Sequence, residues 1–143
     1  MGIKDFATAV EAISTGKTIV PLYATMSGPG ENEGVVISKD EEGVAFTARL
    51  SDDDWYIVQT NDDHFAGVCQ QRCVDANEHM KQIGPENISL ETLLEDVILQ
   101  SHNFNKFTIY TTMFSTSENY FRAYGFDTDM PYVKQEAPTD LFF

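Results

Sequence analysis

Three runs of β-forming residues come in close succession near the start of the chain, and the turns between them decide how they can pair. The second and third runs, 35–38 and 44–50, flank the short polar segment 40–43, which ends in glycine. A connection of this length predicts a β-hairpin. The first run, 18–26, contains Pro21, which has no backbone N–H to give to a neighbouring strand. We therefore expect this strand to lie at an edge of the sheet or to bend at the proline.

Apolar residues at intervals of three and four predict three helices. The first covers residues 3–13 and is expected to end in a left-handed cap at Gly16. The second covers residues 65–83 and stops at a Gly-Pro pair. The third begins at Ser89, because serine is a favoured N-cap residue.

Two more strands are predicted at 55–59 and 106–114, and the last thirty residues are expected to be irregular. The polar segment 61–63 is the one candidate for a boundary between two domains, and it is too short to be a convincing linker. The sequence therefore predicts one α+β domain over residues 1–143. Its antiparallel, twisted sheet is expected to carry the N-terminal helix and two further helices packed on it.

The charge of the chain limits its partners. It carries 9 Lys and Arg against 23 Asp and Glu, a formal net charge of −14. Binding through phosphate neutralisation needs a surplus of cations, so direct nucleic-acid binding and docking on an anionic membrane are not expected. The acidic residues are spread along the chain, and two interpretations stay open: a solubilising surface, or an acidic face that imitates nucleic acid.

The predicted location is the cytoplasm. No N-terminal segment has the pattern of a signal peptide, and no apolar run is long enough to cross a membrane. Two cysteines in 143 residues do not make a disulfide framework.

Cys69 and Cys73 fall on the apolar stripe of the second predicted helix, with His64 and His79 nearby. A free cysteine in such a stripe usually behaves as a small core residue. The four side chains could instead bind zinc, although structural zinc sites usually have tighter spacings. We favour the core interpretation and predict neither a metal nor a cofactor.

No motif in the chain pairs a nucleophile with a base. The Gly-x-Ser-x-Gly turn, the P-loop, the dinucleotide-binding glycine turn and the zinc-protease helix are all missing. Asp52, Asp53 and Asp54 could hold a magnesium ion, but three consecutive aspartates in a turn are more typical of a solvated cap. We therefore assign no catalytic residue and predict a protein that is not an enzyme.

Two segments carry a resemblance to a known family. Residues 5–17 contain a Phe-x-x-Ala helix that ends in Gly-Lys, and residues 51–58 contain a polar turn with Asp-Asp-Trp before a strand. Together, over residues 3–60, they resemble the phage-encoded anti-Thoeris sponge family (Thoeris anti-defence 2). The chain departs from that family at residues 18–23, where the family commonly has a basic residue and then a tryptophan.

The resemblance implies a phage-type counter-defence protein that binds and sequesters a small cyclic signalling nucleotide without catalysis. It also implies a homo-oligomer in the host cytoplasm. We predict Lys17, Tyr23, Asp54 and Trp55 as ligand-binding residues, since a lysine offers a cation for phosphate and a tryptophan a π-face for a base. The alternative is an acidic nucleic-acid mimic that blocks a basic site on a host DNA- or RNA-binding defence protein. The aromatic segment 104–143 is expected either in the core or at an interface.

Overall fold

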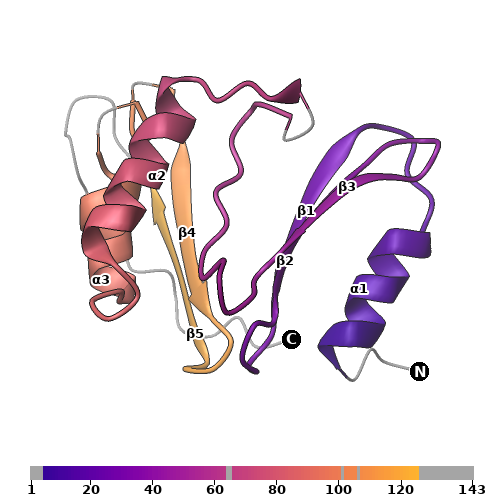
Figure 1. Cartoon of the computed structure of the whole chain (residues 1–143), viewed down its shortest axis with the longest axis horizontal. Helices are drawn as coiled ribbons and strands as arrows, with labels where there is room; N and C mark the ends of the chain where they lie inside the picture. The colour runs from indigo at the N-terminus through magenta and orange to yellow at the C-terminus, as the bar shows by residue number, and fades with distance from the viewer. Residues whose placement is uncertain (1–4, 64–65, 101, 106, 126–143) are drawn as a thin grey trace. The chain divides into compact units, whose positions relative to one another are not determined.

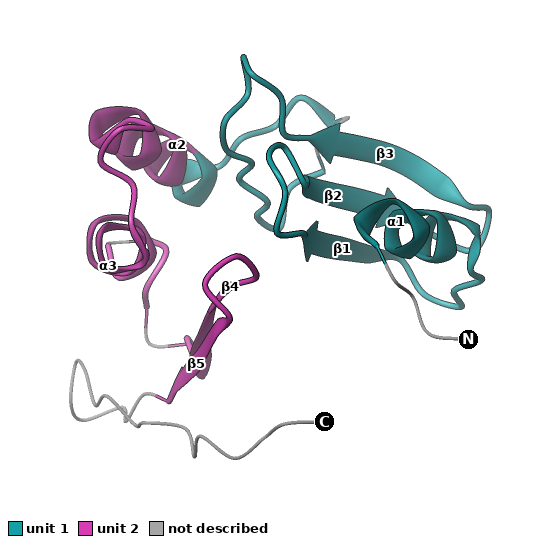
Figure 2. Ribbon diagram, turned by 90° about the horizontal axis from the view of Figure 1, so that it is seen from below, with its two compact units in different colours: residues 1–73 teal, residues 74–143 magenta. Residues whose placement is uncertain are grey.

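The computed structural model describes residues 5–63, 66–100, 102–105 and 107–125. They belong to two compact units, residues 1–73 and 74–143 (Figures 1 and 2). Each unit contains helical residues and its own antiparallel sheet, of three strands in the first and two in the second. The predicted α+β class is therefore confirmed, although the strands are divided between two sheets. The single domain over residues 1–143 stays a prediction.

The first unit is built on the sheet β1 (Leu22–Ser27), β2 (Gly34–Lys39) and β3 (Val44–Arg49). The strands lie in the order β1-β2-β3 with antiparallel neighbours, and all six residues of β2 are buried. The predicted hairpin and the edge position of the first strand are both confirmed. Strand β1 begins just after Pro21, where the backbone no longer lacks an N–H donor.

Helix α1 (Phe6–Thr15) covers one face of this sheet, as Figure 2 shows. Asp5 forms the N-cap, because its side chain accepts a hydrogen bond from the N–H of Thr8 at 2.7 Å. Val10 of the helix packs on Val35 and Ile37 of β2, and these residues form the core of the unit. The predicted first helix is confirmed from residue 6 onward, while residues 1–4 lie outside the described part of the chain.

The C-terminal end of α1 differs from the prediction. Gly16 has φ −59° and ψ 148°, so it is not in the left-handed conformation of the expected cap. The ammonium group of Lys39 takes over this role: it donates to the carbonyl oxygens of Ile13 at 2.7 Å, Ser14 at 3.3 Å and Gly16. Lys39 is only 4% exposed, and a cation is favourable at this end of the helix dipole.

Residues 55–59 do not form the predicted strand. A hydrogen-bonded turn precedes them, in which Ser51 and Asp54 exchange backbone and side-chain hydrogen bonds. The segment is half-buried and lies outside both ladders, and the Trp55 ring packs edge-on against Tyr56 with centroids 4.8 Å apart. Its β-forming residues suit this side-chain packing, and no strand in the described part of the chain pairs with it.

The helices of the second unit are α2 (Gln71–Ile83), whose first residues belong to the first unit, the short α3 (Leu90–Thr92) and the π-helix η2 (Leu93–Ile98). Helix α2 ends at Ile83 and is followed by Gly84, whose φ of 72° places it in the left-handed conformation. Ser89 caps α3 in a reciprocal pair with Thr92, so the predicted N-cap is confirmed. Helix α2 starts at residue 71 and not at 65, and residues 64–65 are not described.

The sheet of the second unit is the hairpin of β4 (Tyr110–Ser115) and β5 (Tyr120–Gly125). Met113 and Tyr124 of this hairpin pack with Leu94 of η2 in the core of the unit. Strand β4 confirms the predicted strand in its second half, but β5 lies where irregular structure was predicted. Among the described aromatic residues some are therefore core, whereas others such as Phe107 and Phe121 are exposed. The rings after residue 125 lie outside the described residues.

Replacing Lys39 by methionine tests how α1 is held. The Lys39→Met side chain keeps most of its apolar stem but leaves three carbonyl oxygens without their donor, so we expect a loss of about 3 kcal/mol in the free energy of unfolding. Urea unfolding measures it. The matched control is Lys17→Met, which changes an exposed lysine of the same unit and should shift the free energy by less than about 0.5 kcal/mol. Equal losses for both variants would contradict the assignment.

Candidate functional site

A dense group of polar side chains surrounds the turn at residues 60–63 in the first unit. It joins this turn to strand β1 and to the chain entering α2 through direct hydrogen bonds. We call it the Asp62 cluster. Its members are Tyr23, Gln59, Thr60, Asn61, Asp62, Asp63, Gln70 and Arg72.

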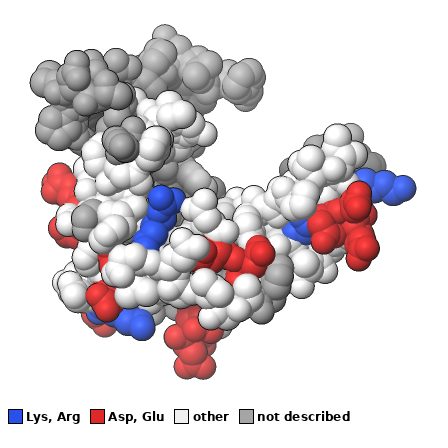
Figure 3. Space-filling view, turned by 90° about the horizontal axis from the view of Figure 1, so that it is seen from above, with Lys and Arg blue, Asp and Glu red and all other residues white. Residues whose placement is uncertain are grey.

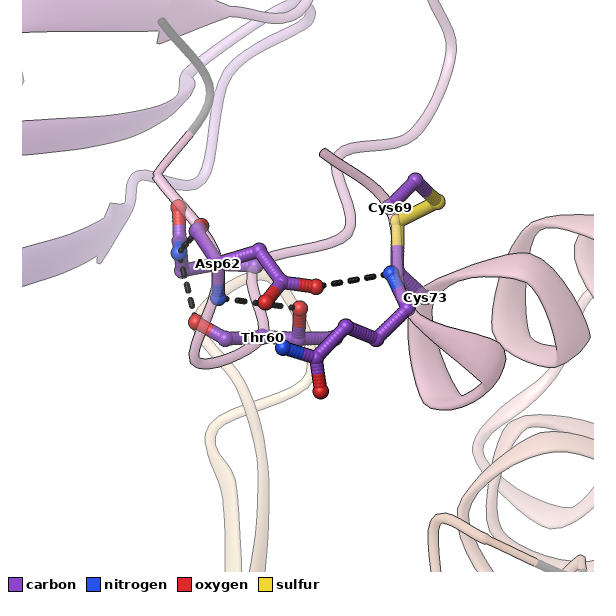
Figure 4. The surroundings of a disulfide bond; sticks show 6 residues. Thr60, Asp62, Cys69 and Cys73 are labelled. Atoms are coloured by element: carbon purple, nitrogen blue, oxygen red, sulfur yellow. Dashed lines mark hydrogen bonds between the residues drawn. A yellow bond between two sulfur atoms is a disulfide. The ribbon is translucent and has the colours of Figure 1, made fainter. Parts of the chain in front are cut away.

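Asp62 is the centre of this cluster (Figure 4). Its carboxylate accepts the backbone N–H of Gln70 at 2.8 Å, and its own N–H donates to the hydroxyl oxygen of Thr60 at 3.4 Å. The amide of Gln59 donates to the carbonyl oxygens of Thr60 and Asp62 at 2.6 and 3.1 Å. The turn is therefore closed by its own side chains and fastened to the chain eight residues later.

The side chain of Asn61 is held in one orientation by Arg72. A guanidinium N–H of Arg72 donates to Asn61 Oδ1 at 2.9 Å. This contact fixes which end of the amide points away, because only the oxygen can accept from a guanidinium. The Nδ2 group keeps two N–H donors and has no hydrogen-bond partner among the described residues, and Asn61 is exposed. The cluster thus presents an oriented pair of donors to solvent.

The other side of the cluster rests on the sheet face opposite α1. The hydroxyl of Tyr23 in β1 donates to Asp63, and the side chains of Ser38 and Gln59 are within its hydrogen-bonding reach. The hydrogen bond to Asp63 is the main reason that the pKa of Tyr23 is raised above 10.0, with burial and the Asp63 charge acting in the same direction. Gln59 Oε1 is buried and has no partner among the described residues.

A disulfide between Cys69 and Cys73 closes a short loop, and this loop contains the residues that form hydrogen bonds to the turn. Gln70 and Arg72, which bond Asp62 and Asn61, both lie between the two cysteines in the sequence. The prediction of two core cysteines is wrong, because the thiols are paired and Cys69 lies on an exposed loop before α2. Zinc binding by thiolates is not compatible with this pairing either.

The four predicted ligand-binding residues are not brought together. Tyr23 belongs to the Asp62 cluster, Lys17 is exposed beyond α1, Asp54 closes the turn at 51–54, and Trp55 packs on a neighbouring ring. No hydrogen bond, ion pair or ring contact in the described part of the chain joins Lys17, Asp54 and Trp55 to one another. Their role in binding a ligand stays a prediction.

The chain is similar to a set of named amide hydrolases. It is 34% identical to an N-acylethanolamine-hydrolyzing acid amidase of Rattus norvegicus over 119 residues, which are 80% of this chain and 33% of that protein. It is 29% identical to acid ceramidase of Homo sapiens over 133 residues, 90% of this chain and 33% of the relative. An N-acylethanolamine-hydrolyzing acid amidase of Caenorhabditis elegans is 29% identical over 123 residues, 82% of this chain and 34% of the relative. No protein-family model matches.

The chain thus spans about a third of the length of the curated relatives it matches. These likenesses cover most of the chain, whereas the anti-Thoeris resemblance covered residues 3–60 through short motifs only. The anti-Thoeris assignment, the nucleotide-sequestering function and the prediction of a protein that is not an enzyme are therefore wrong. A sequence motif consists of residues that lie close together in the sequence. The Asp62 cluster is assembled by contacts between distant positions of the chain, so no motif indicates it.

The acidic-mimic alternative is not favoured by these relatives either, since their names describe hydrolysis. Figure 3 shows acidic side chains in several separate groups on the face in view, with basic side chains between some of them. None of the described helices is long and apolar enough to span a membrane. The predicted homo-oligomer stays a prediction.

Removing the hydroxyl of Tyr23 tests how β1 is joined to the turn. A tyrosine whose pKa is raised by folding adds stability below its unfolded pKa of 10.0 and loses it as pH rises through the folded value. Tyr23→Phe should therefore be less stable than the natural chain at neutral pH, by less than about 1 kcal/mol because the bond is open to solvent. Above a pH of about 10 the difference should close and then reverse.

Urea unfolding at a series of pH values measures this difference. The control is Tyr110→Phe, because Tyr110 is 68% exposed and its hydroxyl has no hydrogen bond among the described residues. It should match the natural chain at every pH. A stability difference for Tyr23→Phe that does not change with alkaline pH would refute the hydrogen bond to Asp63.

Proposed function

We propose that this chain acts in the hydrolysis of fatty-acid amides, as one part of an amide hydrolase. The observation that carries the proposal is the 34% identity, over 80% of the chain, to a protein named for the hydrolysis of N-acylethanolamines. Acid ceramidases match over 90% of the chain. N-acylethanolamines and ceramides share one chemical bond, the amide between a fatty acyl group and the nitrogen of an amino alcohol, and this bond is the proposed substrate class.

The geometry of Asn61 supports a role at the carbonyl of such an amide. When a nucleophile attacks an amide, negative charge develops on the carbonyl oxygen, and preorganised N–H donors stabilise it. Asn61 Nδ2 is such a donor, since Arg72 holds the Oδ1 end at 2.9 Å and leaves the two N–H groups directed elsewhere. The guanidinium also draws electron density from the amide oxygen, which makes these N–H groups better donors.

The nucleophile is assigned to another part of the hydrolase. Both cysteines are joined in the disulfide, so neither offers a thiolate in this form. Because the chain spans about a third of its relatives, the proposal places the attacking group in a segment that corresponds to the remainder. The role of this chain is then to hold and polarise the substrate carbonyl.

The disulfide also bears on the compartment. Structural disulfides persist in oxidising surroundings and are rare in the cytosol, where thiols are kept reduced. The proposed location is therefore an oxidising compartment in place of the predicted cytoplasm. In such a compartment the disulfide would limit the movement of Gln70 and Arg72, because both residues lie within the loop that it closes.

The proposed hydrolysis is tested with the full chain, isolated from the cells that make it together with any polypeptide that stays bound. Release of fatty acid from an N-acylethanolamine and from a ceramide is measured by mass spectrometry. We expect release from at least one of the two, and for Asn61→Ala a fall in kcat of about 100-fold, the usual loss when one oxyanion donor is removed.

The matched control is Asn32→Gly. It removes another exposed amide of the first unit, which bonds Asp52, and glycine suits the φ of 57° at this position. This variant should keep the activity of the natural chain. Absence of fatty acid release from both lipids by a folded preparation would overturn the proposed function. An Asn61→Ala variant with unchanged kcat would remove Asn61 from the site.

The proposed compartment predicts the state of the cysteines in the isolated protein. The chain is unfolded in denaturant with a thiol-alkylating reagent, without and with a reductant. We expect no labelled cysteine without the reductant and two with it, because Cys69 and Cys73 are the only cysteines of the chain. Two labelled cysteines before reduction would place the protein in a reducing compartment.

A further inference from the structure

A cavity of about 470 Å³ lies in the second unit, between the C-terminal half of α2 and the α3–η2 segment. Its volume is in the range of small-molecule sites. The polar side chains that line it are His79, Gln82, Asn87, Thr92, Asp96 and Gln100. All of them belong to the second unit, and the cavity shares no residue with the Asp62 cluster.

Three side chains of this wall each have one hydrogen-bond donor engaged by the backbone. The amide N–H₂ of Asn87 donates to the carbonyl oxygen of Ile83 at 2.9 Å, and that of Gln100 donates to the carbonyl oxygen of Glu95 at 2.7 Å. The Thr92 hydroxyl lies within reach of the carbonyl oxygens of Asn87 and Ser89 and accepts the Ser89 N–H in the α3 cap. Asn87 and Gln100 each keep one amide N–H, and the Gln82 amide has no hydrogen-bond partner among the described residues.

The acceptors of the same wall are still open. Asn87 Oδ1, Gln100 Oε1 and the Asp96 carboxylate have no hydrogen-bond donor among the described residues. His79 adds a buried Nδ1 without a described partner, which is one more acceptor in the Nε2–H tautomer. These open acceptors suit a ligand that supplies protons.

The charge of the wall selects a cation. Asp96 is an acid, and no lysine or arginine is among the described residues that line the cavity. The chain as a whole carries a formal net charge of −14, which also attracts cations at long range. A divalent metal ion is disfavoured, because no group of three His, Cys, Asp or Glu side chains in the described residues could hold one.

We propose that this cavity binds a small organic molecule with a primary ammonium group. The three N–H donors of the ammonium would meet Asp96, Asn87 Oδ1 and Gln100 Oε1, and the volume leaves room for a short carbon chain bearing a hydroxyl. Charge-assisted hydrogen bonds to a carboxylate are the strongest contacts available to such a ligand. The site does not depend on the proposed hydrolysis.

The probe is ethanolamine, titrated into the isotope-labelled full chain and followed by NMR. We expect saturable shifts confined to the cavity, including the side-chain amide signals of Asn87 and Gln100. Asp96→Asn should weaken binding by about tenfold or more. The matched control is Glu95→Gln, which removes the same charge from the neighbouring residue outside the cavity wall and should change binding by less than about twofold.

Gln82→Glu gives a second test if Asp96→Asn fails to fold. It adds a carboxylate to the wall and should tighten binding several-fold. Ethylene glycol and acetate, a neutral and an anionic probe of similar size, should not shift these signals. The proposal is overturned if ethanolamine does not saturate, if both single-charge variants lose binding equally, if either uncharged or anionic probe binds as well, or if Mg²⁺ or Ca²⁺ occupies the cavity in its place.

Discussion

The buried ammonium of Lys39 is the contact on which the first unit depends. Helix α1 has no left-handed cap, and its last carbonyl oxygens would face the sheet without donors if this lysine were absent. Lys39 lies at the end of β2, so the same contact that completes the helix also fixes it over the central strand. The opposite face of the sheet is left to Tyr23 and Ser38, which is where the polar cluster is attached.

The Asp62 cluster shows how an exposed turn can be made rigid without a core. The Asp62 carboxylate and the Asn61 amide each reach across to the loop closed by the disulfide, at 2.8 and 2.9 Å. A polar turn held only by local hydrogen bonds would sample many side-chain orientations, and its donors would not be pre-organised for a ligand. Here both partners of the turn lie within one short covalent ring, which limits their movement relative to each other. That property suits a group that must meet a carbonyl oxygen in one orientation.

Local patterns predicted local structure. The spacing of Phe6 and Val10 and the cap at Ser89 were sufficient for helices, and the glycine of the 40–43 turn for a hairpin. The strand expected at 55–59 was wrong, because β-forming residues also suit a packed segment without a ladder partner. Of the cluster only Tyr23 was selected, since the bonds from Asn61 and Asp62 to the 69–73 loop depend on the tertiary fold. The sequence signal for the cluster is the pair Cys69 and Cys73, four residues apart, that follows the polar residues 60–63. Helical periodicity favours a core position for both cysteines instead.

The π-helix at 93–98 determines which residues face the cavity. Its Leu99 N–H bonds the carbonyl oxygen of Leu94 at 2.9 Å, five residues back, so each turn contains more residues than an α-helical turn. This spacing lets Leu94 and Val97 both be buried while Asp96 and Gln100 line the cavity. The wider winding of this segment therefore sets which of its side chains are buried and which face the cavity. Deleting a single residue from it would restore α-helical winding by removing the extra residue of the wide turn, so the residues that follow would keep their orientation and Gln100 would stay at the cavity wall.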